Sequence, residues 1–114
     1  MSIATTLFEA SPDIRYVATY LDGVLELNQR PGIDHASSSE SDKYEELIVN
    51  PTLLKLIEQR GNIDCGGMQY VVIRYGNFFE FVQPVKGGHV SAGIEPGAAI
   101  GETVAAIRRA IAQV

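Results

Sequence analysis

Residues 41–67, SDKYEELIVNPTLLKLIEQRGNIDCGG, form a long helical pattern in the middle of the chain. Asp42 followed by Glu45 resembles a capping box, which marks the start of a helix. The Asn-Pro pair at 50–51 interrupts the pattern and is typical of a restart, because Asn caps helices and Pro suits their first position. The stretch therefore predicts two short helices, or one kinked helix, over residues 42–60.

The same stretch ends in residues 64–67, Asp-Cys-Gly-Gly, which could be an active-site loop. A nucleophilic cysteine needs a base and a lowered pKa, but His35 and His89 are both distant from Cys65 in sequence. A lone cysteine beside a buried strand is usually a small core residue. We therefore predict that Gly61 stops the helix and that the glycines turn the chain into the next strand.

Strand patterns flank this helix on both sides. They are short, rich in β-branched and aromatic residues, and bounded by glycine-containing turns; they cover residues 14–21, 24–30, 68–75, 78–85 and 89–95. The Asp-Gly pair at 22–23 suits a two-residue hairpin turn. Residues 68–75 are so apolar that we expect a largely buried strand. Pro84 cannot donate to a ladder and is expected near an end or edge.

The end of the chain carries the clearest amphipathic pattern. A stripe with spacings of four, three, four and three predicts one apolar helix face; it consists of Ile100, Val104, Ile107, Ile111 and Val114. Residues 1–12 are expected to be an arm or a short helix. Residues 31–41 form a serine-rich loop, with a phosphorylated switch as the alternative.

These elements have the order β-β-α-β-β-β-α, which predicts a single α+β domain with helices packed on a five-stranded antiparallel sheet. The length of 114 residues suits one domain, and 46% hydrophobic with 20% charged residues indicates a folded chain. Phe78, Phe79 and Phe81 cluster around one strand, so at least one of them must face away from the core.

Composition also limits the partners and the compartment. The net charge is −5 and the basic residues are scattered, which argues against nucleic acid and anionic membrane surfaces. No apolar run approaches the ~18 residues that a membrane span needs. The chain has one cysteine and its start lacks signal-peptide features. We therefore expect a cytoplasmic protein.

No motif predicts an enzyme, a cofactor or a metal site. Residues 60–67, RGNIDCGG, match neither the P-loop nor the dinucleotide fingerprint. His35 and His89 lack metal-ligand spacing and are expected to be exposed loop and turn residues. Glu45 and Glu46 are expected on a solvated helix face. No Ser-His-Asp arrangement or HExxH motif is present.

The sequence resembles the roadblock and dynein-light-chain superfamily, which has a profilin-like or longin-like fold. The features that carry this resemblance are the hairpin YLDGVLELNQR, the middle helix, the stretch MQYVVIRYGNFFEFVQPV and the terminal helix GETVAAIRRAIAQV. The chain departs from the usual pattern in two places. The N-terminal helix of the superfamily could come only from residues 3–10, and the middle helix is interrupted at 50–51.

The resemblance implies a non-enzymatic homodimeric scaffold that regulates a protein partner, possible partners including a small Ras-like GTPase. Such domains commonly pair through the middle helix and the following strand, here residues 42–60 and 68–75. The implied dimer or partner surface consists of Tyr44, Leu47, Leu54, Met68, Tyr70, Val72 and Arg74. The alternative is a small-molecule sensor of PAS-like or profilin-like type, which would show a pocket of roughly several hundred Å³.

Overall fold

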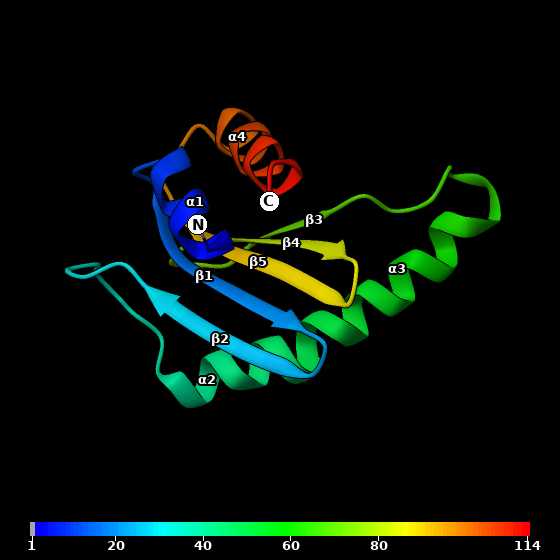
Figure 1. The fold of residues 1–114 in the computed structure, drawn as a ribbon, viewed down its shortest axis with the longest axis horizontal. Helices are drawn as coiled ribbons and strands as arrows, with labels where there is room; N and C mark the ends of the chain where they lie inside the picture. Colours follow the sequence, from blue (N-terminus) through cyan, green and yellow to red (C-terminus); the bar gives the residue numbers. More distant parts are fainter. Residues whose placement is uncertain (1) are drawn as a thin grey trace.

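A computed structural model describes residues 2–114, which fold into three layers (Figure 1). A five-stranded antiparallel sheet with strand order β2-β1-β5-β4-β3 forms the middle layer. Helices α1 and α4 cover one face, and the long middle helix, composed of α2, η1 and α3, crosses the other. The predicted α+β architecture is therefore confirmed. Within the described range, no helix has the length and apolarity to cross a membrane.

The elements follow the predicted order, with a first helix added. In chain order they are α1 (Ile3–Ala10), β1 (Ile14–Leu21), β2 (Val24–Gln29), α2 (Ser39–Tyr44), η1 (Glu45–Val49), α3 (Asn50–Asp64), β3 (Val71–Arg74), β4 (Phe79–Val85), β5 (Gly88–Ile94) and α4 (Ile100–Ala112). Asp22 and Gly23 both have positive φ, 51° and 82°, as the predicted two-residue hairpin turn requires.

The apolar core lies between the sheet and the pair α1 and α4. Alternate residues of the central strand β5 face it, and Val104, Ile107 and Ile111 of α4 are buried against them. Leu7 joins the same core from α1, so residues 3–10 form a helix rather than an arm. The predicted α4 stripe holds in its middle, whereas Val114 at its end is exposed.

The middle helix differs from the prediction at its start and at its interruption. The helix begins at Ser39, because the Ser38 hydroxyl caps it by accepting from the Ser41 amide; Asp42 is therefore inside it. Asn50 has helical backbone angles and caps nothing. Residues 45–49 form a π turn instead, in which the Asn50 amide bonds to the Glu45 carbonyl.

The π turn explains how the helix passes its proline without breaking. A proline within an α-helix lacks the N–H and crowds the carbonyl four residues earlier. A π turn has an i→i+5 hydrogen bond and is wider than an α turn. Pro51 follows this wider turn directly, and the helix continues to Asp64. Of the two predicted alternatives, two short helices is therefore wrong, because residues 39–64 are helical without a break.

The prediction that Gly61 stops the helix was also wrong. Gly61 is buried inside α3, and the chain folds back so tightly that a Cβ there would lie 3.0 Å from the Gly67 carbonyl carbon. Gly66 and Gly67 have positive φ and turn the chain toward β3, as predicted. Cys65 is exposed rather than part of the core, because it lies outside the sheet on this turn.

The strand predicted over residues 68–75 is shorter and less buried than expected. β3 spans four residues, and Val72 is 37% exposed. The reason is its place at the edge of the sheet, where it pairs with β4 alone. Pro84 lies next to the last residue of β4, as predicted. Phe81 belongs to the core with Phe79 packed against it.

Candidate functional site

The sheet face under the middle helix is polar, in contrast to the apolar core on the other side. At its centre the Glu46 carboxylate is fully buried and has four hydrogen-bond partners. These lie 2.7–3.0 Å away and are the Tyr16 hydroxyl, the side-chain amide of Asn50, a His89 ring nitrogen and the Ser91 hydroxyl. We call these five residues the Glu46 network. It joins η1 and α3 to β1 and β5.

Two sequence expectations are corrected by this network. Glu46 does not lie on a solvated helix face, and His89 is buried with 2% exposure rather than an exposed turn residue. Both follow from tertiary placement, because the helix lies across β5 where His89 and Ser91 point toward it. His35 is exposed, as expected. Among residues 2–114, no group of three or more potential ligands is placed to hold a metal ion.

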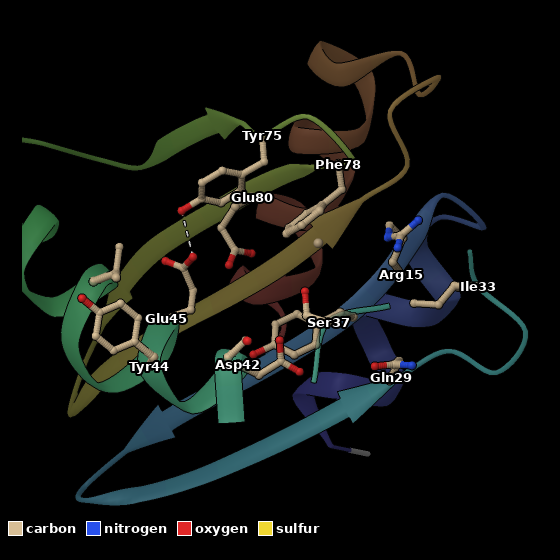
Figure 2. A pocket seen from close by; sticks show the side chains of 14 residues that line it. Arg15, Gln29, Ile33, Ser37, Asp42, Tyr44, Glu45, Tyr75, Phe78 and Glu80 are labelled. Atoms are coloured by element: carbon tan, nitrogen blue, oxygen red, sulfur yellow. Dashed lines mark hydrogen bonds between the residues drawn. The ribbon is translucent and has the colours of Figure 1, made fainter. Parts of the chain in front are cut away.

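A pocket of about 370 Å³ lies beside the Glu46 network, between the sheet and the start of the middle helix. We call it the sheet–η1 pocket (Figure 2). The sheet, the loop before the middle helix and the start of the middle helix contribute to its wall. Its residues include Arg15, Tyr16, Gln29, Ile33, Ser37, Asp42, Tyr44, Glu45, Tyr75, Phe78, Glu80 and Gly93. Ile33 and Ser37 belong to the predicted loop, which therefore forms one side of the pocket.

Glycine at position 93 brings the pocket walls together. A Cβ at this position would lie 3.3 Å from the Tyr16 Cβ and 3.6 Å from the Phe78 ring. Phe78 is therefore the phenylalanine of the cluster that faces away from the core, and its ring centroid lies 5.4 Å from that of Tyr75. The Tyr75 hydroxyl in turn donates to the Glu45 carboxylate at 2.8 Å.

Three carboxyl groups line this pocket on neighbouring elements. Burial raises the pKa of Asp42, and the nearby Glu46 charge adds to this. Burial also raises the pKa of Glu45, against the opposing hydrogen bond from Tyr75. The one basic residue of the wall, Arg15, is paired with Glu95 at 3.2 Å and donates to the Asp34 carbonyl. The pocket therefore carries excess negative charge.

Glu80 is the most deeply buried of the three acids. It is 2% exposed, and its Oε1 has no hydrogen-bond partner within the described chain. Burial raises the pKa of Glu80 well above its ordinary range, and repulsion from Glu46, Glu45 and Asp42 adds to this, with Asn50 opposing. The folded protein therefore holds a proton on Glu80 that the unfolded chain releases at lower pH.

We expect Glu80→Gln to remove part of the pH dependence of stability. The unfolded chain releases the Glu80 proton around the ordinary pKa of 4.5. Above this pH the folded state binds more protons than the unfolded state, so the free energy of unfolding falls as pH rises. Glutamine cannot ionise, so the variant should gain stability relative to wild type as the pH rises from 4.5 to 8.

Urea unfolding at both pH values measures this gain. The control is Glu102→Gln, which changes an exposed acid on α4. A gain of equal size in both variants would contradict the assignment to Glu80.

The predicted dimer surface is not one continuous face. Leu54 is 7% exposed, so most of its side chain is already covered within its own protomer. Tyr70 and Arg74 face the α4 side of the sheet, where Arg108 covers Tyr70 and Arg74 lies over Phe79. Leu47 is exposed on the middle helix, on the other side.

The remaining candidates are divided in the same way. Tyr44 is exposed and lines the sheet–η1 pocket, and Met68 is half-buried on the segment before β3. Val72 pairs in register with Phe81 of β4. The candidates on the middle helix and those around β3 therefore lie on opposite faces of the sheet.

Three solved structures share this arrangement of elements. The structure described as MglB with tetrameric arrangement has a TM-score of 0.71 at 11% identity, over 95% of this chain and 81% of that chain. The gliding protein MglB from Thermus thermophilus has a TM-score of 0.69 at 12% identity, over 95% and 82%. The chain has a roadblock-like fold.

MglC from Myxococcus xanthus is a third structure with this fold, at a TM-score of 0.52 and 12% identity over the full length of both chains. No protein-family model matches the sequence, and no curated protein matches it significantly. In this roadblock-like fold, α1 supplies the N-terminal helix that the sequence pattern left open. The structural similarity therefore establishes the fold, although the sequence identity is only 11–12%.

Tyr44 was predicted only as part of a partner surface and the other pocket residues were not predicted as a site, although one signal was present. Glu80 stands between Phe79 and Phe81 in a strand, and neighbours in a strand face opposite sides. A polar residue at that position therefore predicts a polar second face. Ser91 of β5 and Tyr16 of β1 lie on the same face of the sheet as Glu80, so the three together indicate a buried polar layer under a helix.

Proposed function

We propose that this roadblock-like domain is a non-enzymatic homodimeric regulator that binds a protein partner, with a small Ras-like GTPase as the partner class. The observation that carries the dimer is the free edge of β3 with apolar residues on both sides. In the described chain, β3 pairs only with β4, which leaves its outer backbone groups without strand partners. Such an edge is a ready template for another strand.

The helix that precedes β3 in the chain supports the same proposal. Leu56 is 61% and Ile63 is 75% exposed, and they lie seven residues apart on one face of α3. Exposed apolar residues at this spacing form a stripe that a second helix could cover. Edge and stripe together would let two copies extend one sheet and pair their helices, as the resemblance implies. One of the structural neighbours, MglB, is described in a tetrameric arrangement.

We expect the double variant Leu56→Glu and Ile63→Glu to convert a dimer into a monomer. Both side chains are exposed in the protomer, so the change should leave folding intact while placing like charges from both subunits in the dimer interface. Size-exclusion chromatography with light scattering measures the mass, and circular dichroism checks the fold. The matched control is Val24→Glu, which changes a 61% exposed residue on the opposite edge strand, β2.

Two results would contradict the dimer. Wild-type protein that stays monomeric at tens of micromolar would do so, and so would a double variant that remains dimeric.

The GTPase is tested with a Ras-like GTPase encoded beside this gene, if one is present. We expect it to bind in its GTP-loaded form, with the dimer as the binding species. Equal binding by the GDP-loaded form, or by the monomeric variant, would remove the regulatory proposal.

Small-molecule sensing is the second candidate function, and the volume of the sheet–η1 pocket favours it. The pocket measures about 370 Å³, within the range of roughly 300–1,000 Å³ that is typical of ligand sites. A pocket of this kind was the feature expected to separate a sensor from a scaffold with a filled core. The two candidates are compatible, because the pocket lies under η1 and the proposed dimer surface lies along α3 and β3.

A further inference from the structure

Two carboxyl oxygens of the sheet–η1 pocket are buried without a hydrogen-bond partner among residues 2–114. They are Glu45 Oε2, on the middle helix, and Glu80 Oε1, on the central part of the sheet. Buried polar atoms are almost always paired, so each such oxygen requires an explanation. Figure 2 shows both carboxyl groups directed into the same space, above Asp42 and Ser37. Two acceptors that face one pocket suit a ligand with at least two N–H donors.

The acidic residues of the pocket indicate that the ligand carries a positive charge. Asp42 joins Glu45 and Glu80 on the wall, whereas the positive charge of Arg15 is already paired with Glu95. The three acids are close enough for Glu45 and Asp42 to raise the pKa of Glu80, after the larger effect of burial. A cation placed between them would relieve this repulsion, and an anion would increase it.

The aromatic residues of the pocket indicate that the rest of the ligand is an apolar organic group. Tyr16, Tyr44, Tyr75 and Phe78 line the same pocket as the carboxyl groups. Aromatic faces attract cations within about 6 Å of the ring centre and also cover apolar groups. The Phe78 ring already receives a cation in this way, because the Arg15 guanidinium lies 5.7 Å from its centroid. A small organic cation fits such walls better than a hydrated metal ion does.

We infer that the sheet–η1 pocket is a binding site for a small primary or secondary organic amine in its ammonium form. Binding releases the proton that Glu80 holds in the free protein, so the ammonium group donates to Glu45 Oε2 and to the ionised Glu80 at Oε1. Asp42 supplies further negative charge, and the apolar body lies against the aromatic walls. The loop that carries Ile33 and Ser37 closes one side of the site. This inference rests on the protomer alone and does not depend on the proposed dimer.

The test uses 2-phenylethylammonium as the probe, with the full-length protein and two-dimensional ¹H–¹⁵N NMR. We expect saturable shifts at Tyr75, Phe78 and Gly93, which surround the site. Two matched probes separate the contributions, since 2-phenylethanol is neutral and 3-phenylpropanoate is negatively charged. The loss of charge-assisted hydrogen bonds should weaken 2-phenylethanol at least about tenfold, and 3-phenylpropanoate should not bind.

Two variants identify the carboxyl groups. Glu80→Leu removes an unpartnered acceptor while keeping an apolar side chain of similar size, so it should fold, and Asp42→Asn removes a charge without changing shape. Each should weaken 2-phenylethylammonium about tenfold, in line with the loss of one charged hydrogen bond or charge. Glu26→Leu, on the exposed part of β2, is the control and should bind as wild type does.

The inference is overturned by any of four results. The first is no saturable binding of 2-phenylethylammonium up to about 10 mM, which is beyond the range of useful affinities. The second is chemical-shift changes that map outside the pocket. The third is 2-phenylethanol binding as tightly as the ammonium, and the fourth is unchanged affinity in folded Glu80→Leu. Mg²⁺ and Ca²⁺ are titrated alone as a further arm. Metal-induced shifts of the pocket residues that 2-phenylethylammonium does not displace would also overturn it.

Discussion

Glu46→Leu is expected to lower the free energy of unfolding by about 3–5 kcal/mol, the range for breaking a buried charged interaction by removal of one partner. Leucine fills a similar volume but accepts no hydrogen bond. The Tyr16 hydroxyl, the Asn50 amide, the His89 ring and the Ser91 hydroxyl would all lose their acceptor inside the protein. Since a domain is stable by about 5–15 kcal/mol, this is a large fraction of the total.

Urea unfolding followed by circular dichroism measures this loss. The control is Glu102→Leu, which makes the same change at an exposed position of α4 and should alter stability by about 0.5 kcal/mol or less. Glu46→Gln keeps one oxygen but turns an acceptor into a donor, so it should lie between the two. A loss below about 1 kcal/mol in Glu46→Leu would show that the network adds little to stability.

Gly88→Ala is expected to cost at least about 3 kcal/mol, the upper part of the range for overpacking. A Cβ on Gly88 would lie 1.7 Å from the Tyr20 carbonyl oxygen and 2.8 Å from its carbon. Both atoms belong to the backbone of β1, so no side-chain rotation can relieve the clash. Gly88 begins β5 and pairs with Leu21, so the two central strands would have to separate there.

Thermal unfolding of Gly88→Ala can be compared directly with Gly101→Ala. Nothing lies within 4 Å of a Cβ on Gly101, which is the second residue of α4. Alanine there should be neutral or stabilising by up to about 1 kcal/mol, because glycine is a poor helix former. If both alanine variants melt at the wild-type temperature, β1 and β5 are not held as closely as the structure indicates.

The local elements were predictable because their signals are local. The hairpin depends on one Asp-Gly pair with positive φ, and α4 depends on a stripe that a single helix face displays. The order of these elements along the chain was also predicted correctly from the sequence patterns, apart from the additional helix α1. Cys65 and Gly61 were misjudged because their surroundings depend on how the chain returns after α3, which no neighbouring residue specifies.

The candidate site was less predictable, for a physical reason. Glu46 has the pattern of a solvated helix residue, and only the position of the helix across β5 brings His89 and Ser91 to it. Glu80 is buried by contacts with a helix that lies far earlier in the chain. Strand alternation could have revealed the polar face, but the pocket also needs the loop at Ile33 and Ser37, which has no pattern of its own.

The π turn at residues 45–49 has a consequence for changes in chain length. A π turn holds one residue more than an α turn, so deleting one residue there would restore a regular α-helix. The register of the helix before the deletion would then rotate by about 100° relative to α3. Glu45 and Glu46 could no longer both face the sheet. Homologous chains that keep this polar layer should therefore conserve the length of the turn and its acidic pair, while residues 47–49 vary in sequence. A one-residue gap in the turn should coincide with loss of the acidic pair.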